Sequence, residues 1–169
     1  MARIRKVEIE HFRSIRSLVW HPGPGINCLI GPGDSGKSTI LDAVDWCMGA
    51  RRSVSASDTD FYGLDVSRPI VITLTLGELS DRLKSFEVYG DCLRGFDSLT
   101  DEVHDEPGAR LETVLSLRLS IHSDLEPMWS LYSERTAAAA PPRMLHCKDR
   151  VALATVRLGP HPRYHLPSP

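Results

Sequence analysis

The sequence has no long hydrophobic run, and this absence excludes one class of protein at the outset. No apolar stretch approaches the roughly 18 residues that a membrane-spanning helix needs. The N-terminus, residues 1–6, is basic, but Glu8 and Glu10 follow at once, where a secretory signal would need an apolar core. We therefore expect a cytoplasmic protein with no membrane partner.

Closely spaced cysteines are also absent. The chain has four cysteines, which are scattered and form no Cys-x-x-Cys pair: Cys28, Cys47, Cys92 and Cys147. This spacing favours reduced, mostly buried thiols over a disulfide framework or a zinc site.

Charge of one sign is not in large excess, because the net charge is −2 and the pI is about 6.4. That balance argues against a nucleic-acid-binding surface along the whole chain but leaves room for a local basic patch. The candidates for such a patch are Arg3, Arg5, Lys6, Arg13 and Arg16. They are expected either to contact DNA phosphates or to form a solvated strand edge.

What the sequence does contain is the composition of one folded domain. Its 169 residues are 41% hydrophobic and 25% charged, which is enough apolar content for a real core. We expect residues 1–158 to form one lobe. Residues 159–169 contain four prolines, and we expect them to be a disordered tail.

Apolar–polar alternation and β-branched residues predict an α/β fold, a mixed sheet with antiparallel strands and one long helix packed against it. The expected strands are residues 4–10, 12–20, 26–30, 69–76, 111–121, 128–132 and 151–158. The expected helix covers residues 38–48 and ends at Gly49, and residues 78–88 have helix-like spacing. Residues 89–110 are expected to form a loop, and residues 137–142 a linker or a short capped helix.

One motif carries specific chemistry. The pattern Gly31-x-x-x-x-Gly36-Lys37-Ser38 is a Walker A motif, or P-loop, between an expected strand and an expected helix. The sequence therefore predicts binding of a nucleoside triphosphate, with Mg-ATP as the expected ligand. The predicted nucleotide-binding residues of the loop are Gly31, Pro32, Gly33, Asp34, Ser35, Gly36, Lys37, Ser38 and Thr39.

Each part of this motif has a physical reason. Glycines permit close approach, so successive backbone N–H groups form a nest around the β-phosphate. The start of the helix adds partial positive charge. Lys37 reaches the β- and γ-phosphates as a point charge, and the Ser38 hydroxyl is the predicted Mg²⁺ ligand. Thr39 is expected to contact the α-phosphate.

Two segments together resemble a narrower group. The pattern Ile4-x-x-Val7-x-Ile9-x-x-Phe12-Arg13-Ser14-Ile15 precedes the P-loop, which continues into Ile40-Leu41-Asp42-Ala43. These segments resemble the N-terminal ATPase lobe of RecF/SMC-type ABC ATPases. Within that group they are most similar to the OLD (overcoming lysogenisation defect) family of ATP-dependent endonucleases. Residues 57–61 and 70–79 are also similar to that family's early ATPase lobe.

The resemblance implies an ATPase head linked to DNA metabolism, repair or phage defence, which works as a head-to-head dimer that sandwiches ATP. It places Arg13 near the nucleotide phosphates or at dimer contacts, with a solvated surface arginine as the alternative. Many relatives have Asn where Asp34 stands. A carboxylate near the γ-phosphate weakens binding unless Mg²⁺ or a hydrogen bond offsets it.

Several parts of a complete family ATPase are missing from the sequence. There is no apolar strand ending in Asp-Glu (Walker B), no ABC signature and no toprim nuclease domain, and the chain contains no glutamine for a Q-loop. The sequence therefore identifies no catalytic residue. We expect an N-terminal lobe, truncated relative to the family, that binds ATP weakly and turns it over slowly or not at all.

Three other interpretations stay open on the sequence. The chain is either a nucleotide-binding interaction subunit that needs a partner chain carrying Walker B, a different P-loop protein such as a small kinase, or a non-functional remnant. Base preference, DNA binding and oligomeric state are not determined by these residues.

Overall fold

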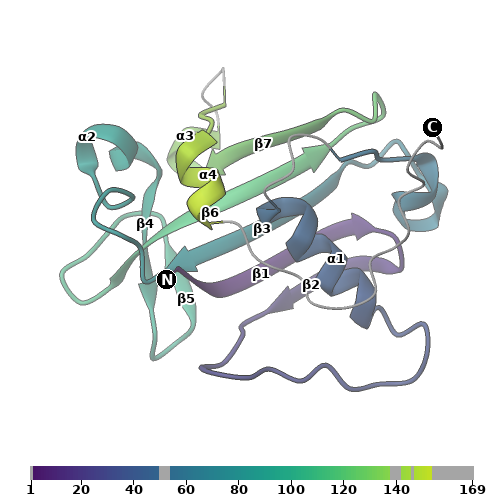
Figure 1. Cartoon of the computed structure of the whole chain (residues 1–169), viewed down its shortest axis with the longest axis horizontal. Coiled ribbons are helices and arrows are strands. Elements are labelled where there is room, and N and C mark those ends of the chain that lie inside the picture. Colours follow the sequence, from purple (N-terminus) through teal and green to yellow (C-terminus); the bar gives the residue numbers. More distant parts are fainter. Residues whose placement is uncertain (1, 50–53, 138–141, 146, 154–169) are drawn as a thin grey trace, which may run out of the picture.

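A computed structural model describes residues 2–49, 54–137, 142–145 and 147–153. Within these residues a single sheet of seven strands forms the centre of the molecule (Figure 1). The strands are β1 (Arg3–Phe12), β2 (Ile15–Trp20), β3 (Ile70–Gly77), β4 (Leu93–Asp97), β5 (Glu102–His104), β6 (Glu112–Ile121) and β7 (Pro127–Tyr132). The helices are α1 (Lys37–Met48), α2 (Phe86–Tyr89), α3 (Glu134–Ala137) and α4 (Cys147–Leu153).

The strands pair in the order β2-β1-β3-β6-β4-β5, and β7 pairs with the second half of β6 beside β4. Every strand pair among the described residues is antiparallel. Helix α1 lies across the middle of the sheet on β1, β3 and β6 (Figure 1). The predicted α/β class and the antiparallel strands are confirmed, but the sheet is not the predicted mixed one, because no two of its described strands pair in parallel.

The two faces of the sheet differ because side chains alternate along each strand. The register aligns apolar rows under α1: Val7-Leu74-Leu117-Leu131 and Ile9-Ile72-Leu119-Trp129. These side chains are buried and form the main core with α1. The other face carries polar rows: Lys6-Thr75-Ser116-Tyr132 and Glu8-Thr73-Arg118-Ser130.

Most predicted elements form where the sequence places them, but the strand at residues 26–30 was a wrong prediction. This segment has no strand structure and is open to solvent, with Ile26 94% and Ile30 93% exposed. A strand needs a hydrogen-bonded neighbour, and none of the described residues pairs with this segment. It forms instead part of the long connection from β2 to α1 (Figure 1).

Two further predictions were wrong. Residues 89–110 were expected to be a loop but contain the hairpin β4–β5. Residues 151–153 were expected to begin a strand but end helix α4. In residues 78–88, the helix-like spacing gives turns around Leu83 and the short helix α2. The predicted tail, 159–169, and most of the Ala-Pro segment lie outside the described residues.

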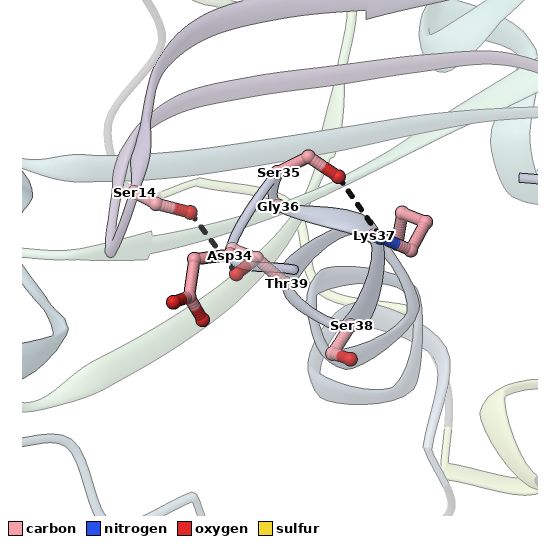
Figure 2. Close-up of a pocket in the computed structure, with 7 residues that line it drawn as sticks. All are labelled: Ser14, Asp34, Ser35, Gly36, Lys37, Ser38 and Thr39. Atoms are coloured by element: carbon pink, nitrogen blue, oxygen red, sulfur yellow. Dashed lines mark hydrogen bonds between the residues drawn. The ribbon is translucent and has the colours of Figure 1, made fainter. Parts of the chain in front are cut away.

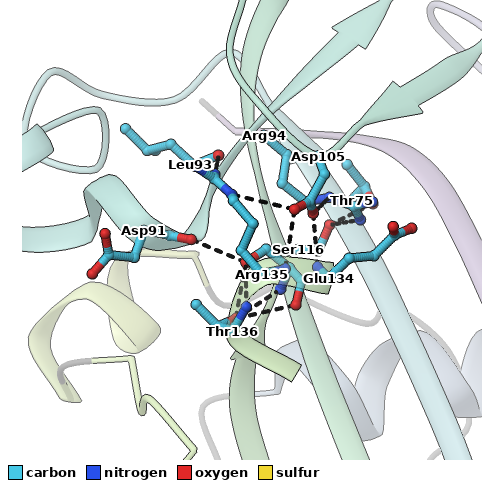
Figure 3. Close-up of polar contacts among 10 residues, drawn as sticks. Thr75, Asp91, Leu93, Arg94, Asp105, Ser116, Glu134, Arg135 and Thr136 are labelled. Carbon is cyan, nitrogen blue, oxygen red and sulfur yellow. Dashed lines mark hydrogen bonds and ion pairs between the residues drawn. The ribbon is translucent and has the colours of Figure 1, made fainter. Parts of the chain in front are cut away.

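One carboxylate ties the β4–β5 hairpin, whose strand β4 also pairs with β6, to the start of α3. Asp105, just after β5, accepts hydrogen bonds from the backbone N–H groups of Glu134 (2.7 Å) and Arg135 (3.0 Å), which begin α3 (Figure 3). It also forms ion pairs with Arg135 (3.2 Å) and with the buried Arg94 (3.5 Å). The hairpin is thereby fastened to the end of β7.

Candidate functional site

The P-loop lies at the N-terminal end of α1, as the sequence predicted. Gly36 is the N-cap of this helix and has φ = +84°, a left-handed conformation that glycine adopts without strain. The backbone N–H of Ile40 donates to the Gly36 oxygen at 2.9 Å, which closes the first helical turn. The N–H groups of the first turn have no acceptor inside the helix, so they are available to an anion.

A pocket of about 180 Å³ opens at this helix end (Figure 2). Its lining residues are Ser14, Asp34, Ser35, Gly36, Lys37, Ser38 and Thr39. The volume suits a group the size of a few phosphates and is below the roughly 300 Å³ at which pockets for whole small molecules begin. The described residues thus supply a place for the phosphate end of a nucleotide.

Lys37 folds back onto the loop in this structure. Its ammonium group donates to the Gly31 oxygen (2.8 Å), the Pro32 oxygen and Ser35 Oγ (3.0 Å). An ammonium group has three donors, so all of them are used within the loop. A phosphate that binds Lys37 must replace at least one of these acceptors.

Some of the other predicted loop residues line the pocket, and some do not. Ser38 is exposed at the pocket, while Thr39 is buried and its Oγ1 lies 3.3 Å from Ser14 Oγ. Asp34 is exposed on the pocket wall with φ = +56°. Gly31, Pro32 and Gly33 do not line the pocket. The sequence missed Ser14, although it lies beside Arg13 in the Phe12-Arg13-Ser14-Ile15 pattern.

Arg13 lies beside the P-loop helix, not in the pocket lining. Its Nε donates to Asp60 Oδ1 at 2.8 Å, and its Nη1 pairs with Asp42 Oδ2 on α1. Its guanidinium carbon lies 4.9 Å from the centre of the Phe12 ring and 5.3 Å from that of Trp46. Burial lowers the pKa of Arg13, but the hydrogen bonds and charges of Asp60 and Asp42 raise it further, so the net direction is upward.

The other basic residues near the N-terminus are also paired. Arg3 and Arg5 form ion pairs with Glu78, Arg5 also pairs with Glu112 at 2.7 Å, and Lys6 pairs with Glu8 at 2.7 Å. Intramolecular partners therefore neutralise most of the predicted basic patch.

Two absences hold for the described part of the chain. No group of three or more His, Cys, Asp or Glu side chains there is arranged to hold a metal ion. No helix there has the length and apolar character to cross a membrane.

Comparisons with known proteins agree with this geometry. A family model described as an AAA domain matches residues 6–88. The DNA replication and repair protein RecF of Chlorobium phaeovibrioides is 39% identical over 56 residues, which cover 33% of this chain and 15% of RecF. The chromosome partition protein Smc of Koribacter versatilis is 26% identical over 152 residues, covering 84% of this chain and 11% of Smc.

A solved structure from a study of ATP-driven dimerization and DNA-stimulated activation of SMC ATPases has the same fold. Its TM-score is 0.52 at 16% identity, and the match covers 89% of this chain and 76% of that one. This chain therefore has the fold of an SMC-type ATPase lobe and is similar in sequence to parts of RecF and Smc. The chain spans only 15% and 11% of the length of the two relatives described above.

Proposed function

We propose that this chain binds the phosphate end of Mg-ATP as the N-terminal lobe of a RecF/SMC-like ATPase. The observation that carries the proposal is the pocket at the start of α1, where Lys37, Ser38 and Thr39 line one phosphate-sized space. Helix N–H groups, an ammonium group and hydroxyls are the donors that polyphosphate requires.

Each group in the pocket has a role toward phosphate or Mg²⁺ that follows from its chemistry. The backbone from Gly36 to Thr39 holds the β-phosphate, and Lys37 leaves the Gly31 and Pro32 oxygens for phosphate oxygens. The Ser38 hydroxyl fits Mg²⁺, because Mg²⁺ bound with a nucleotide takes few protein oxygens and fills its other positions with phosphate and water. The carboxylate of Asp34 opposes the γ-phosphate unless Mg²⁺ offsets its charge.

Hydrolysis needs a group that orients the attacking water, and the sequence offers no such group. We therefore expect binding without rapid turnover by the isolated chain. A catalytic rate near one per second would contradict this part of the proposal.

The role in the cell is inferred from the relatives. RecF is named for DNA replication and repair and Smc for chromosome partition, so we place this chain in DNA metabolism with a dimeric or partner-completed head. The narrower assignment to the OLD family, with its links to phage defence and to an endonuclease, rests on the Ile4–Ile15 and P-loop patterns and on residues 57–61 and 70–79. The ion pairs of the N-terminal basic residues favour DNA contacts elsewhere in an assembled head.

Thermal unfolding tests the binding proposal. Because a ligand that binds only the folded state raises its stability, Mg-ATP at about 100 times its Kd adds roughly 2.7 kcal/mol. We expect Mg-ATP to raise the Tm of the wild-type chain and to leave the Tm of Lys37→Ala unchanged. Equal shifts for both proteins would mean that ATP binds outside the P-loop.

A second candidate function is an interaction subunit that a partner chain completes. The exposed segment 26–30 favours it, because this segment has the β-branched and apolar composition of a strand but pairs with no other described residue. A partner strand beside it would cover Ile26 and Ile30 and close the open side of the P-loop. An ATPase rate that appears only on mixing with a Walker B-containing chain would support this candidate.

A further inference from the structure

We infer that Arg13 is a positioning residue that holds the first turns of α1, and so the phosphate pocket, against the β1–β2 turn. This inference rests on the proposed function, which makes that helix end the phosphate site. It differs from a role at the nucleotide phosphates or at dimer contacts, the two positions that the family resemblance implied for Arg13.

Backbone contacts, independent of the Arg13 side chain, fix the position of the β1–β2 turn. His11 and Arg13 have φ = +53° and +50°, so the backbone turns sharply on either side of Phe12. The Arg13 N–H donates to the Asp60 oxygen at 2.7 Å, and Phe12 forms a β-bridge with Phe61. The turn therefore has a fixed position relative to the segment that carries Asp60.

The guanidinium then joins three separate parts of the chain. It holds Asp60 through Nε and Asp42 of α1 through Nη1, and both carboxylates are mostly buried, with 12% and 14% of their side chains exposed. Phe12 and Trp46 lie at the guanidinium, so the cation is also fixed by aromatic rings. The planar fork of arginine suits two simultaneous carboxylate partners, whereas a lysine ammonium is a single point charge.

A second contact links the β1–β2 turn to the pocket itself. Ser14 follows Arg13, lines the pocket, and lies 3.3 Å from Thr39 through the two hydroxyl oxygens (Figure 2). Arg13 and Ser14 thus hold Asp42 and Thr39, which are one helical turn apart on α1. Without Arg13 the two carboxylates lose their shared cation and repel each other, so the start of α1 shifts.

Hydrogen exchange in the absence of nucleotide tests the positioning directly. We expect Arg13→Ala to speed exchange at least about tenfold in residues 37–43 while β6 stays protected. The exchange rates of Arg13→Lys should lie between those of the wild type and those of Arg13→Ala. Arg16→Ala is the matched control, because Arg16 is an exposed arginine in the next strand. Unchanged exchange in residues 37–43 of Arg13→Ala overturns the inference whether or not the chain binds ATP.

Measured affinities for Mg-ATP and Mg-ADP then distinguish a positioning role of Arg13 from a direct contact with phosphate. Arg13→Ala is expected to weaken Mg-ATP and Mg-ADP by the same factor, about tenfold, and adding Asp42→Ala is expected to cause little further loss. A selective loss of ATP over ADP, or fully additive losses, overturns the inference in favour of a direct phosphate contact. If the wild type binds neither nucleotide, the proposed function fails, and the exchange result alone decides the role of Arg13.

Discussion

At the scale of single residues, the P-loop forms a phosphate-sized pocket, but its lysine is already hydrogen-bonded within the loop. Lys37 donates to Gly31, Pro32 and Ser35 with all three of its N–H groups. Binding energy from phosphate is therefore reduced by the loss of these contacts, while the helix N–H groups make new bonds. This exchange is the physical reason to expect weak binding by the isolated lobe.

Gly36 gives a first prediction at this scale. Alanine at φ = +84° is strained, and its Cβ would lie 3.4 Å from Ser14 Oγ. We expect Gly36→Ala to lower the free energy of unfolding by about 1 kcal/mol, measured by urea denaturation. Gly33→Ala is the control, because a Cβ at Gly33 meets nothing within 4 Å. Equal losses in the two variants would contradict the account of the loop.

Cysteine reactivity gives a second prediction. Cys28 is exposed, whereas Cys47 lies on the face of α1 that packs on the sheet, and this burial raises its pKa from 9.0 to about 12. At pH 8 the thiolate fraction of Cys47 is thus about a thousandfold below that of an ordinary thiol. Iodoacetamide should modify Cys28 in the native protein and Cys47 only after unfolding, as read by peptide mass spectrometry. Rapid native modification of Cys47 would mean that α1 is not packed on the sheet.

The residues of the P-loop could be predicted because their identity alone encodes the chemistry. The environment of Arg13 could not, because its partners Asp42 and Asp60 are 29 and 47 residues away in sequence and nothing in the segments that contain them indicates this pairing. The same limit applies to Asp105, which looks like part of a solvated acidic loop until α3 is placed beside it.

At the scale of elements, pairing decides which apolar segments become strands. Residues 69–76 and 111–121 alternate clearly, and residues 70–76 pair with residues 115–121. Residues 26–30 are equally strand-like in composition but have no neighbour among the described residues. Local sequence therefore predicts the tendency to form a strand, and the presence of a partner decides the outcome.

An ion pair crosses the end of β3 at Gly77. Arg5 of β1 reaches Glu112 of β6 across Gly77, where a Cβ would lie only 2.5 Å from Glu112 Oε1. The absence of a side chain at Gly77 is what permits this ion pair between strands that are not neighbours.

That ion pair predicts a pH dependence. Burial raises the pKa of Glu112, but the Arg5 hydrogen bond, the Glu78 N–H and the Arg5 charge lower it more, so it lies below 4.5. The stabilisation is complete above about pH 4.5 and is lost as pH falls through the lowered pKa. We expect Glu112→Gln to cost about 1 kcal/mol at pH 7 and nothing at pH 2, measured by urea denaturation.

The exposed Glu102 supplies a control for this prediction. Glu102→Gln should leave stability unchanged at both pH values. A loss in Glu112→Gln that is as large at pH 2 as at pH 7 would show that packing, not charge, accounts for the effect.

At the scale of the whole molecule, α1 covers one face of the sheet, and the segment before the P-loop, residues 26–30, is exposed to solvent. The core under α1 is continuous, so the lobe has the means to fold by itself. The segment before the P-loop leaves Ile26 and Ile30 in solvent, a surface that invites association.

This surface gives a prediction about association. Because Ile26 and Ile30 are almost fully exposed, Ile26→Ser with Ile30→Ser should change stability by less than about 0.5 kcal/mol while reducing aggregation, measured by light scattering. Ile72→Ser, at a fully buried position, should instead cost about 3 kcal/mol. A large loss of stability in the double variant would mean that the segment packs against the fold.

The most direct test of the central claim is calorimetric titration of the purified chain with Mg-ATP. The account predicts weak saturable binding that Lys37→Ala abolishes and that Lys84→Ala, an exposed lysine far from the loop in sequence, leaves intact. A folded wild-type chain that takes up no Mg-ATP, or a Lys37→Ala variant that binds as well as the wild type, would contradict it.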